Sequence, residues 1–87
     1  MKLSVNSQQK NIIGSQIRCL RLSRNLTQGQ VAARLQLQGY NFTELIILRI
    51  EKGQRLVTDI ELKILCQFFE VTPDTLLGFE KPEHPQP

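Results

Sequence analysis

Two short motifs, in which a threonine stands three residues before a glutamine or glutamate, constrain the fold of this chain most. Thr27 is followed by Gln30, and Thr58 is followed by Glu61. In such a capping box the threonine hydroxyl accepts a hydrogen bond from the later backbone amide, and the later side chain accepts one from the threonine amide. Each motif therefore predicts the first turn of a helix.

Apolar residues recur at helical spacing after both motifs. Residues three and four positions apart lie on one face of a helix, so each run predicts a buried stripe. No stretch alternates apolar and polar residues over a useful length, which argues against strands. The two stripes are Val31, Ala32 and Leu35 in the first helix and Leu62, Leu65, Cys66 and Phe69 in the second.

Three more helices are expected. Residues 11–24 carry a stripe and end near Asn25, a residue that tolerates the left-handed conformation. Thr43 is expected to cap a helix that stops at Gly53. A short helix is expected to begin at Pro73 and to close at Gly78. The stripes are Ile13, Ile17 and Leu20 in the first of these helices and Ile47 and Ile50 in the second, where Phe42 is expected to pack on Ile47.

Length and composition fit one small domain. An 87-residue chain buries only about 60–65% of its unfolded surface, so a deep enzyme pocket would be hard to build. No apolar run approaches the roughly 20 residues of a membrane span, and no signal peptide is apparent. We expect a cytoplasmic protein with a flexible arm over residues 1–10, a helical domain over 11–78 and a disordered, proline-rich tail over 79–87.

Cysteine and histidine offer little chemistry. Cys19 and Cys66 have no C-x-x-C spacing and fall in helical patterns, so both are expected to be reduced, small core residues and not a disulfide or metal site. The single histidine, His84, lies in the tail. No nucleophile with a base beside it, phosphate loop or acidic metal cluster is present, so neither an enzyme nor a cofactor is expected.

Charge is distributed unevenly along the chain. Residues 1–43 carry six basic and no acidic residues, whereas residues 44–87 carry five basic and eight acidic residues. The two parts therefore have net charges of +6 and −3. Such asymmetry suits a surface that meets a polyanion, although solvated arginines on helix faces would give the same count.

Three segments together resemble the phage repressor and Cro-like helix-turn-helix family, also called the xenobiotic-response-element type. They are "IGSQIRCLRLSRNLTQGQVAARL", "LRIEKGQR" and "LCQFFEVTPDTLLG", and the resemblance covers about residues 12–78. It implies a compact, all-α, repressor-like bundle of five helices. The helices after Thr27 and after Thr43 would form the DNA-binding pair.

The resemblance also implies roles for single residues. Arg21 and Glu51 match a structural ion pair of several family members. Glu44, Leu45 and Arg49 fall where the base readers of the family lie. By their chemistry, Arg49 could pair with guanine or instead contact a phosphate or solvent, Leu45 could touch a thymine methyl group, and Glu44 could accept from a cytosine amine but repels phosphate. The residues that would hold the DNA backbone are Gln28, Thr43, Lys52 and Arg55.

The chain departs from the family pattern in two places. "QLQGY", residues 36–40, adds about five residues before the second DNA-binding helix, either as a tolerated extension or as a contact to DNA through Gln38 or Tyr40. That helix is also unusually apolar, which predicts weak or partner-assisted readout. Its Ile46, together with three residues of the helix after Thr58, either thickens the core or forms a dimer patch. Those three residues are Ile60, Ile64 and Phe68.

We therefore expect a sequence-specific regulator that binds double-stranded DNA, as a homodimer, with no membrane association. The alternative is a protein-interaction module of the same fold, such as an antitoxin-like or accessory component, in which the apolar helices bind a protein partner. A fragment of a longer repressor would show the same residues.

Overall fold

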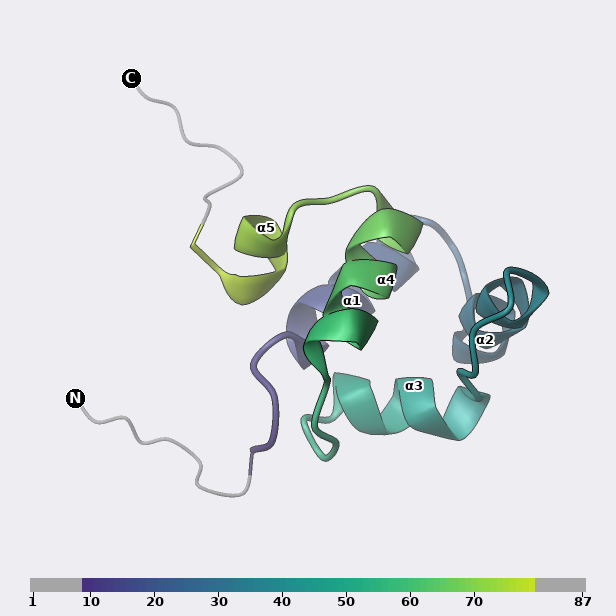
Figure 1. Ribbon diagram of the computed structural model, residues 1–87, viewed down its shortest axis with the longest axis horizontal. Helices are drawn as coiled ribbons and strands as arrows, with labels where there is room; N and C mark the ends of the chain where they lie inside the picture. Colours follow the sequence, from purple (N-terminus) through teal and green to yellow (C-terminus); the bar gives the residue numbers. More distant parts are fainter. Residues whose placement is uncertain (1–8, 80–87) are drawn as a thin grey trace.

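Five helices and no strand make up residues 9–79, the part of the chain that the computed structural model describes (Figure 1). The third helix packs against the first two, and the fifth packs against the fourth. The predicted all-α, five-helix architecture is confirmed. The helices are α1 (Gly14–Ser23), α2 (Gln28–Leu37), α3 (Glu44–Glu51), α4 (Asp59–Phe69) and α5 (Pro73–Leu77).

Threonine side chains begin four of the helices. Both predicted capping boxes are present: Thr27 accepts from the amide of Gln30, and Thr58 accepts from the amide of Glu61, with the reciprocal bonds in place. Thr43 caps α3 by accepting from the amide of Ile46 at 3.1 Å, and Thr72 caps α5. Each cap satisfies an amide that has no partner within its own helix. Local sequence thus sets where these helices start.

α1 starts later than the sequence indicates. The expected start was near Asn11, but the helix begins at Gly14. The Asn11 side chain explains the difference, because its Oδ1 accepts from the amides of Ile13 and Gly14. Its Nδ2 donates to the carbonyl oxygens of Ile50 and Arg55 at 3.1 and 2.9 Å. Asn11 therefore joins the start of α1 to the end of α3.

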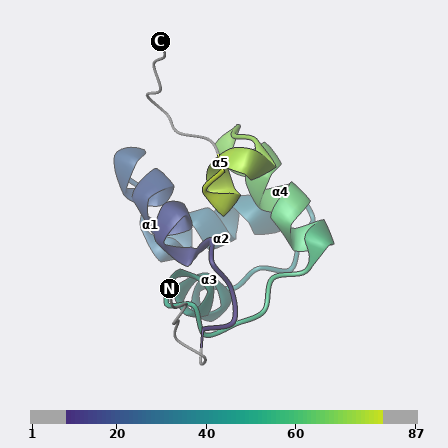
Figure 2. The same cartoon turned by 90° about the vertical axis from the view of Figure 1, so that its left-hand side faces the viewer.

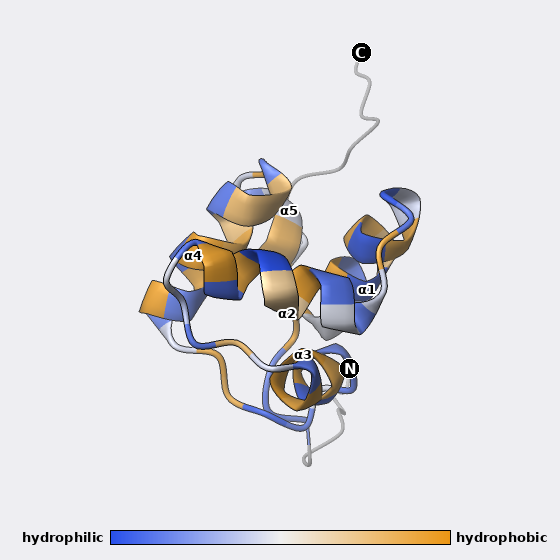
Figure 3. Cartoon of the chain, turned by 90° about the vertical axis from the view of Figure 1, so that its right-hand side faces the viewer, coloured by the Kyte–Doolittle hydropathy of each residue, from blue (hydrophilic) through white to orange (hydrophobic). Residues whose placement is uncertain are grey.

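The hydrophobic core draws on all five helices and on the turns between them. The predicted stripes of α1, α2, α3 and α4 lie in it, although Leu20 and Leu62 are only partly buried at its edge. Figure 3 shows hydrophobic colouring over most of α3. The buried apolar residues are Ile13, Ile17, Leu26, Val31, Ala32, Leu35, Phe42, Ile47, Ile50, Leu65, Cys66, Phe69 and Leu76.

The inserted segment "QLQGY" lengthens α2 and then forms an ordered turn. α2 runs to Leu37, and Gly39 adopts a φ of 94°, as expected for a glycine that stops the helix. The Gln36 side chain donates to the carbonyl oxygen of Phe42 at 2.7 Å, and Tyr40 packs against the core. The insertion is therefore held at both ends.

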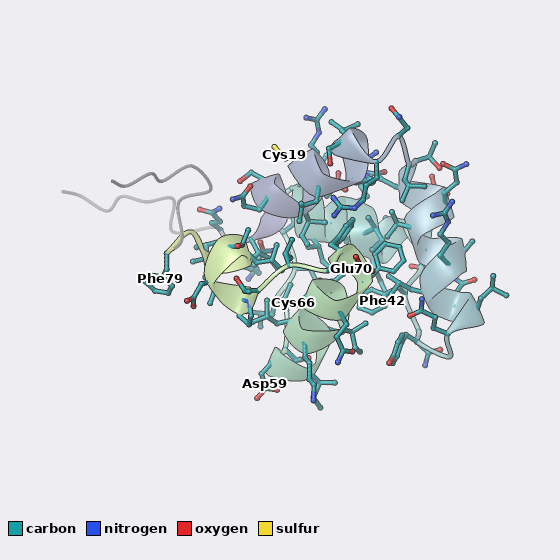
Figure 4. All side chains as sticks on the ribbon, turned by 90° about the horizontal axis from the view of Figure 1, so that it is seen from above. Cys19, Phe42, Asp59, Cys66, Glu70 and Phe79 are labelled. Atoms are coloured by element: carbon teal, nitrogen blue, oxygen red, sulfur yellow. The ribbon has the colours of Figure 1, made fainter. Side chains whose placement is uncertain are left out.

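The cysteine prediction is half wrong. Cys66 is buried and free, and burial raises the pKa of its thiol, so it stays protonated. Cys19 is free but exposed, at the outer edge of α1 in Figure 4. The reason is its position on the helix, because the buried side of α1 is formed by Gly14, Ile17 and Arg21.

The ends of the described segment are attached to the helical body. The amide of Lys10, which we assigned to the arm, donates to the carbonyl oxygen of Gly53 at 2.8 Å. The amide of Phe79, the first residue of the predicted tail, donates to the carbonyl oxygen of Asp74 at 2.9 Å. Residues 1–8 and 80–87, which hold the rest of the predicted arm and tail, lie outside the described residues. Within residues 9–79, no helix is long and apolar enough to span a bilayer.

Candidate nucleic-acid interface

α3 lies along one outer edge of the molecule, at the bottom in Figures 1 and 2. Ile47 and Ile50 hold its inner side in the core, while Leu45 and Arg49 are exposed on its outer side. Lys52, the next residue at helical spacing, is exposed as well. Leu45, Arg49 and Lys52 thus follow one another at spacings of four and three along one face. We call these three residues the outer stripe of α3.

A buried ion pair fixes α3 against α1. Arg21 Nε lies 2.6 Å from Glu51 Oε2, and Arg21 Nη2 lies 2.9 Å from Glu51 Oε1. The side chains are only 9% and 3% exposed. Arg21 Nη1 also donates to the carbonyl oxygen of Leu26 at 2.9 Å, in the turn before α2. These are the two residues that the resemblance pairs, and their bidentate contact holds α1, the turn and α3 in one arrangement.

Gln28 belongs to the same network. Its Nε2 donates to Glu51 Oε1 at 3.0 Å. We expected this side chain to contact a phosphate, but in the structure it links the first turn of α2 to the last turn of α3. The hydrogen bond therefore joins the two helices that would approach DNA. A phosphate contact from Gln28 would need a second rotamer or the backbone amide at the start of α2.

The two basic residues that follow α3 differ in their partners. Arg55 donates to Glu61 through Nη1 at 2.9 Å and through Nη2 at 3.1 Å, and to the carbonyl oxygen of Leu56. The hydrogen bond from Arg55 holds the pKa of Glu61 below its usual value. Lys52 has no ion pair within residues 9–79. Of the two predicted phosphate contacts, Lys52 is thus the one with an uncommitted charge.

A groove runs between α1, the start of α2 and α3. Its lining includes Gln28, Glu44 and Lys52 from our expected set, and also Arg18 from α1. Arg18 is exposed and is a cation that sequence reasoning missed. Arg18 stands three residues before Arg21, so the two side chains lie on the same face of α1. Because the Arg21–Glu51 pair holds that face against α3, Arg18 lies at the groove.

Glu44 leans toward α2. A Cβ atom added to Gly29 would lie 3.3 Å from Glu44 Oε1 and 3.9 Å from Oε2. The carboxylate therefore lies over the second residue of α2, across the groove from its own helix. Thr43, expected to touch the DNA backbone, is exposed, and its hydroxyl caps α3.

The candidate dimer patch is divided by burial. Three of its residues are half-buried and pack against the core, as expected if they thicken it: Ile46, Ile64 and Phe68. Ile60 is 69% exposed, and so is its near neighbour Leu56, at 70%. Sequence reasoning missed Leu56 because it stands in the turn before α4, outside any helical stripe.

The arrangement of α2, the inserted turn and α3 defines a helix-turn-helix domain in a five-helix body, with basic side chains around the outer stripe. No three His, Cys, Asp or Glu side chains within the described part gather where they could hold a metal ion.

A solved structure of the same architecture supports this class. The chain is similar to the DNA-binding domain of BldD, with a TM-score of 0.67 and 26% sequence identity, over 84% of this chain and 99% of that one. The likeness therefore extends over nearly the whole of that domain. Comparison of the sequence with protein-family models finds no match, and neither does comparison with curated protein sequences.

Proposed function

We propose that this protein is a sequence-specific transcriptional regulator, of the phage repressor and Cro-like type, that binds duplex DNA with α3 in the major groove. The observation that carries the proposal is the outer stripe of α3. It presents one guanidinium, one ammonium and one apolar side chain on an outer face of a helix-turn-helix domain. The likeness to the DNA-binding domain of BldD supports the same conclusion. The regulator would act in the cytoplasm.

Each part of the stripe has a distinct task. Arg49 reads guanine through two hydrogen bonds, and Leu45 packs on a thymine methyl group. Lys52 and Arg18 neutralise phosphates on either side of the groove. Thr43, Gln28 and Arg55 would stand near the DNA backbone. To contact it, Arg55 would first have to leave Glu61, and the Gln28 side chain would have to leave Glu51.

A second copy of the chain completes the readout. One helix with a single strong base contact gains only about 1–3 kcal/mol of discrimination from that contact. Two copies on half-sites about one helical turn apart would double it. Leu56 and Ile60, both exposed and close in sequence, are the surface that we assign to the contact between copies.

The exposed apolar side chains also favour the second candidate function, a protein-interaction module. Leu37 is 88% exposed on the extended end of α2, and Leu45 is 50% exposed on α3. In that case α3 binds a protein, and duplex DNA binds weakly or not at all.

The experiment that tests the first proposal compares three single variants on a duplex selected from a random pool and on an unrelated duplex. Arg49→Ala should reduce the binding free energy for the selected duplex by about 1–3 kcal/mol and should change the binding free energy for the unrelated duplex little. Lys52→Ala should lower the affinity for both duplexes by the same factor and reduce the slope of log K against log salt by about 1. Lys63→Ala, which removes an exposed charge from α4, is the matched control and should change neither. Equal effects from Lys52→Ala and Lys63→Ala would contradict the proposal.

A further inference from the structure

The groove beside the outer stripe contains two carboxylates, and they are held differently. Glu51 is neutralised by Arg21 and also accepts from Gln28. Glu44 is exposed and has no ion pair within residues 9–79. The groove therefore has one uncompensated negative charge among the cations Arg18 and Lys52.

The position of that charge matters for any approaching polyanion. The carboxylate of Glu44 lies over Gly29, whose missing side chain leaves room for it. Gly29 is in the first turn of α2, where backbone amides point outward and the helix dipole favours negative charge. The carboxylate thus stands between the start of α2 and a DNA phosphate that would approach it.

A carboxylate acts differently on matched and unmatched DNA. Against a backbone it repels phosphate, whatever the sequence. If the Glu44 side chain turns from Gly29 to a base edge, it can accept a hydrogen bond from the N4 amine of cytosine in the major groove, which partly offsets that repulsion. The cost of Glu44 therefore falls more heavily on DNA that lacks a cytosine at the right place, and such a repulsive element is a common source of specificity.

We propose that Glu44 is a discrimination residue, whose carboxylate competes with phosphate at the groove and weakens binding to unrelated DNA more than to the selected site. The proposal rests on the proposed function, because it assigns a role within the same DNA-binding surface. In this role Glu44 acts through the repulsion between its carboxylate and phosphate, in addition to any hydrogen bond that it accepts from a base.

The test is Glu44→Gln, which keeps the size of the side chain and removes its charge. On the unrelated duplex at low salt, affinity should rise about tenfold, because the carboxylate no longer repels phosphate. The gain should shrink as salt rises, because salt screens that repulsion. On the selected duplex the gain in affinity should be about threefold or less, because the lost hydrogen bond to cytosine offsets the lost repulsion, so the specificity ratio falls. The matched control is Glu70→Gln, which removes an exposed carboxylate at the end of α4 and should leave both affinities unchanged.

The outcomes separate the two proposals. An equal gain on both duplexes would show only long-range charge and would overturn the role of Glu44, and so would no gain on either. If neither the wild type nor Glu44→Gln binds any duplex at low salt, the proposed function itself has failed. Urea unfolding of each variant shows whether an altered affinity reflects an altered fold.

Discussion

At the scale of single residues, local spacing predicts hydrogen bonds within one turn of chain, but not contacts between helices. Both capping boxes could be read from the sequence because their partners stand three residues apart. The Arg21–Glu51 pair was accessible only through the family resemblance, since its partners lie 30 positions apart. The Gln28–Glu51 bond and the lean of Glu44 toward Gly29 depend on how α2 and α3 pack. No local pattern in the sequence specifies how these two helices pack.

The Arg55–Glu61 ion pair gives a prediction about pH. The hydrogen bond from Arg55 lowers the pKa of Glu61 in the folded chain. The stabilisation is therefore complete above the ordinary pKa of 4.5 and is lost as the pH falls through the lowered folded value. Glu61→Gln should remove it while keeping the capping box, because Gln30 closes the equivalent box of α2. We expect a loss of up to about 1 kcal/mol at neutral pH.

Urea unfolding of the wild type and Glu61→Gln across the acidic range measures this. The difference in the free energy of unfolding should shrink toward zero below pH 4.5, where the carboxyl group of Glu61 takes up a proton. A difference that stays constant down to strongly acidic pH would show that the ion pair contributes nothing.

At the scale of helices, the sequence predicts the ends that depend on glycine and threonine and misses those that depend on tertiary contact. Gly39 and Gly53 adopt the positive φ values expected of residues that stop α2 and α3. α4 ends differently, at Glu70 with a φ of 59°, and no sequence signal marked that residue as left-handed. The shift of the α1 start to Gly14 follows from the Asn11 side chain, which accepts from the amides of Ile13 and Gly14 and also donates to the carbonyl oxygen of Ile50 at the end of α3.

Two glycine substitutions separate tertiary from local roles. In isolation, Gly14→Ala should favour α1, because alanine is the better helix former. In the folded chain its Cβ would meet the carbonyl oxygens of Ile50 and Glu51, so we expect a loss of about 3 kcal/mol. Gly39→Ala meets nothing within 4 Å and should cost only the strain of a positive φ, about 1–2 kcal/mol.

Chemical denaturation followed by circular dichroism ranks the two variants. The larger cost for Gly14→Ala is the expected result, since α1 would have to move away from α3. If Gly14→Ala is instead as stable as the wild type, the close approach of α1 to α3 is absent in solution.

At the scale of the whole molecule, the fold was predictable because its signals are redundant, whereas the site was predictable only in part. Helix-forming stripes, caps and the order of the motifs all indicated five helices. The charge asymmetry pointed to a polyanion, but it could not show that Arg21 is buried, that Arg55 is paired, or that Arg18 reaches the groove. Packing decides which cations are left without an ion pair, and it also decides that Leu56 and Ile60 are exposed.

Fluorescence anisotropy with labelled duplex DNA, from low to near-physiological salt, would show whether the wild-type protein binds DNA. Selection from a random pool would show whether it prefers one sequence. We expect log K to fall steeply with log salt, and we expect selection to enrich a two-fold symmetric site with guanine at the position that Arg49 reaches. Absence of binding even at low salt would contradict the proposed function and would assign the apolar face of α3 to a protein partner.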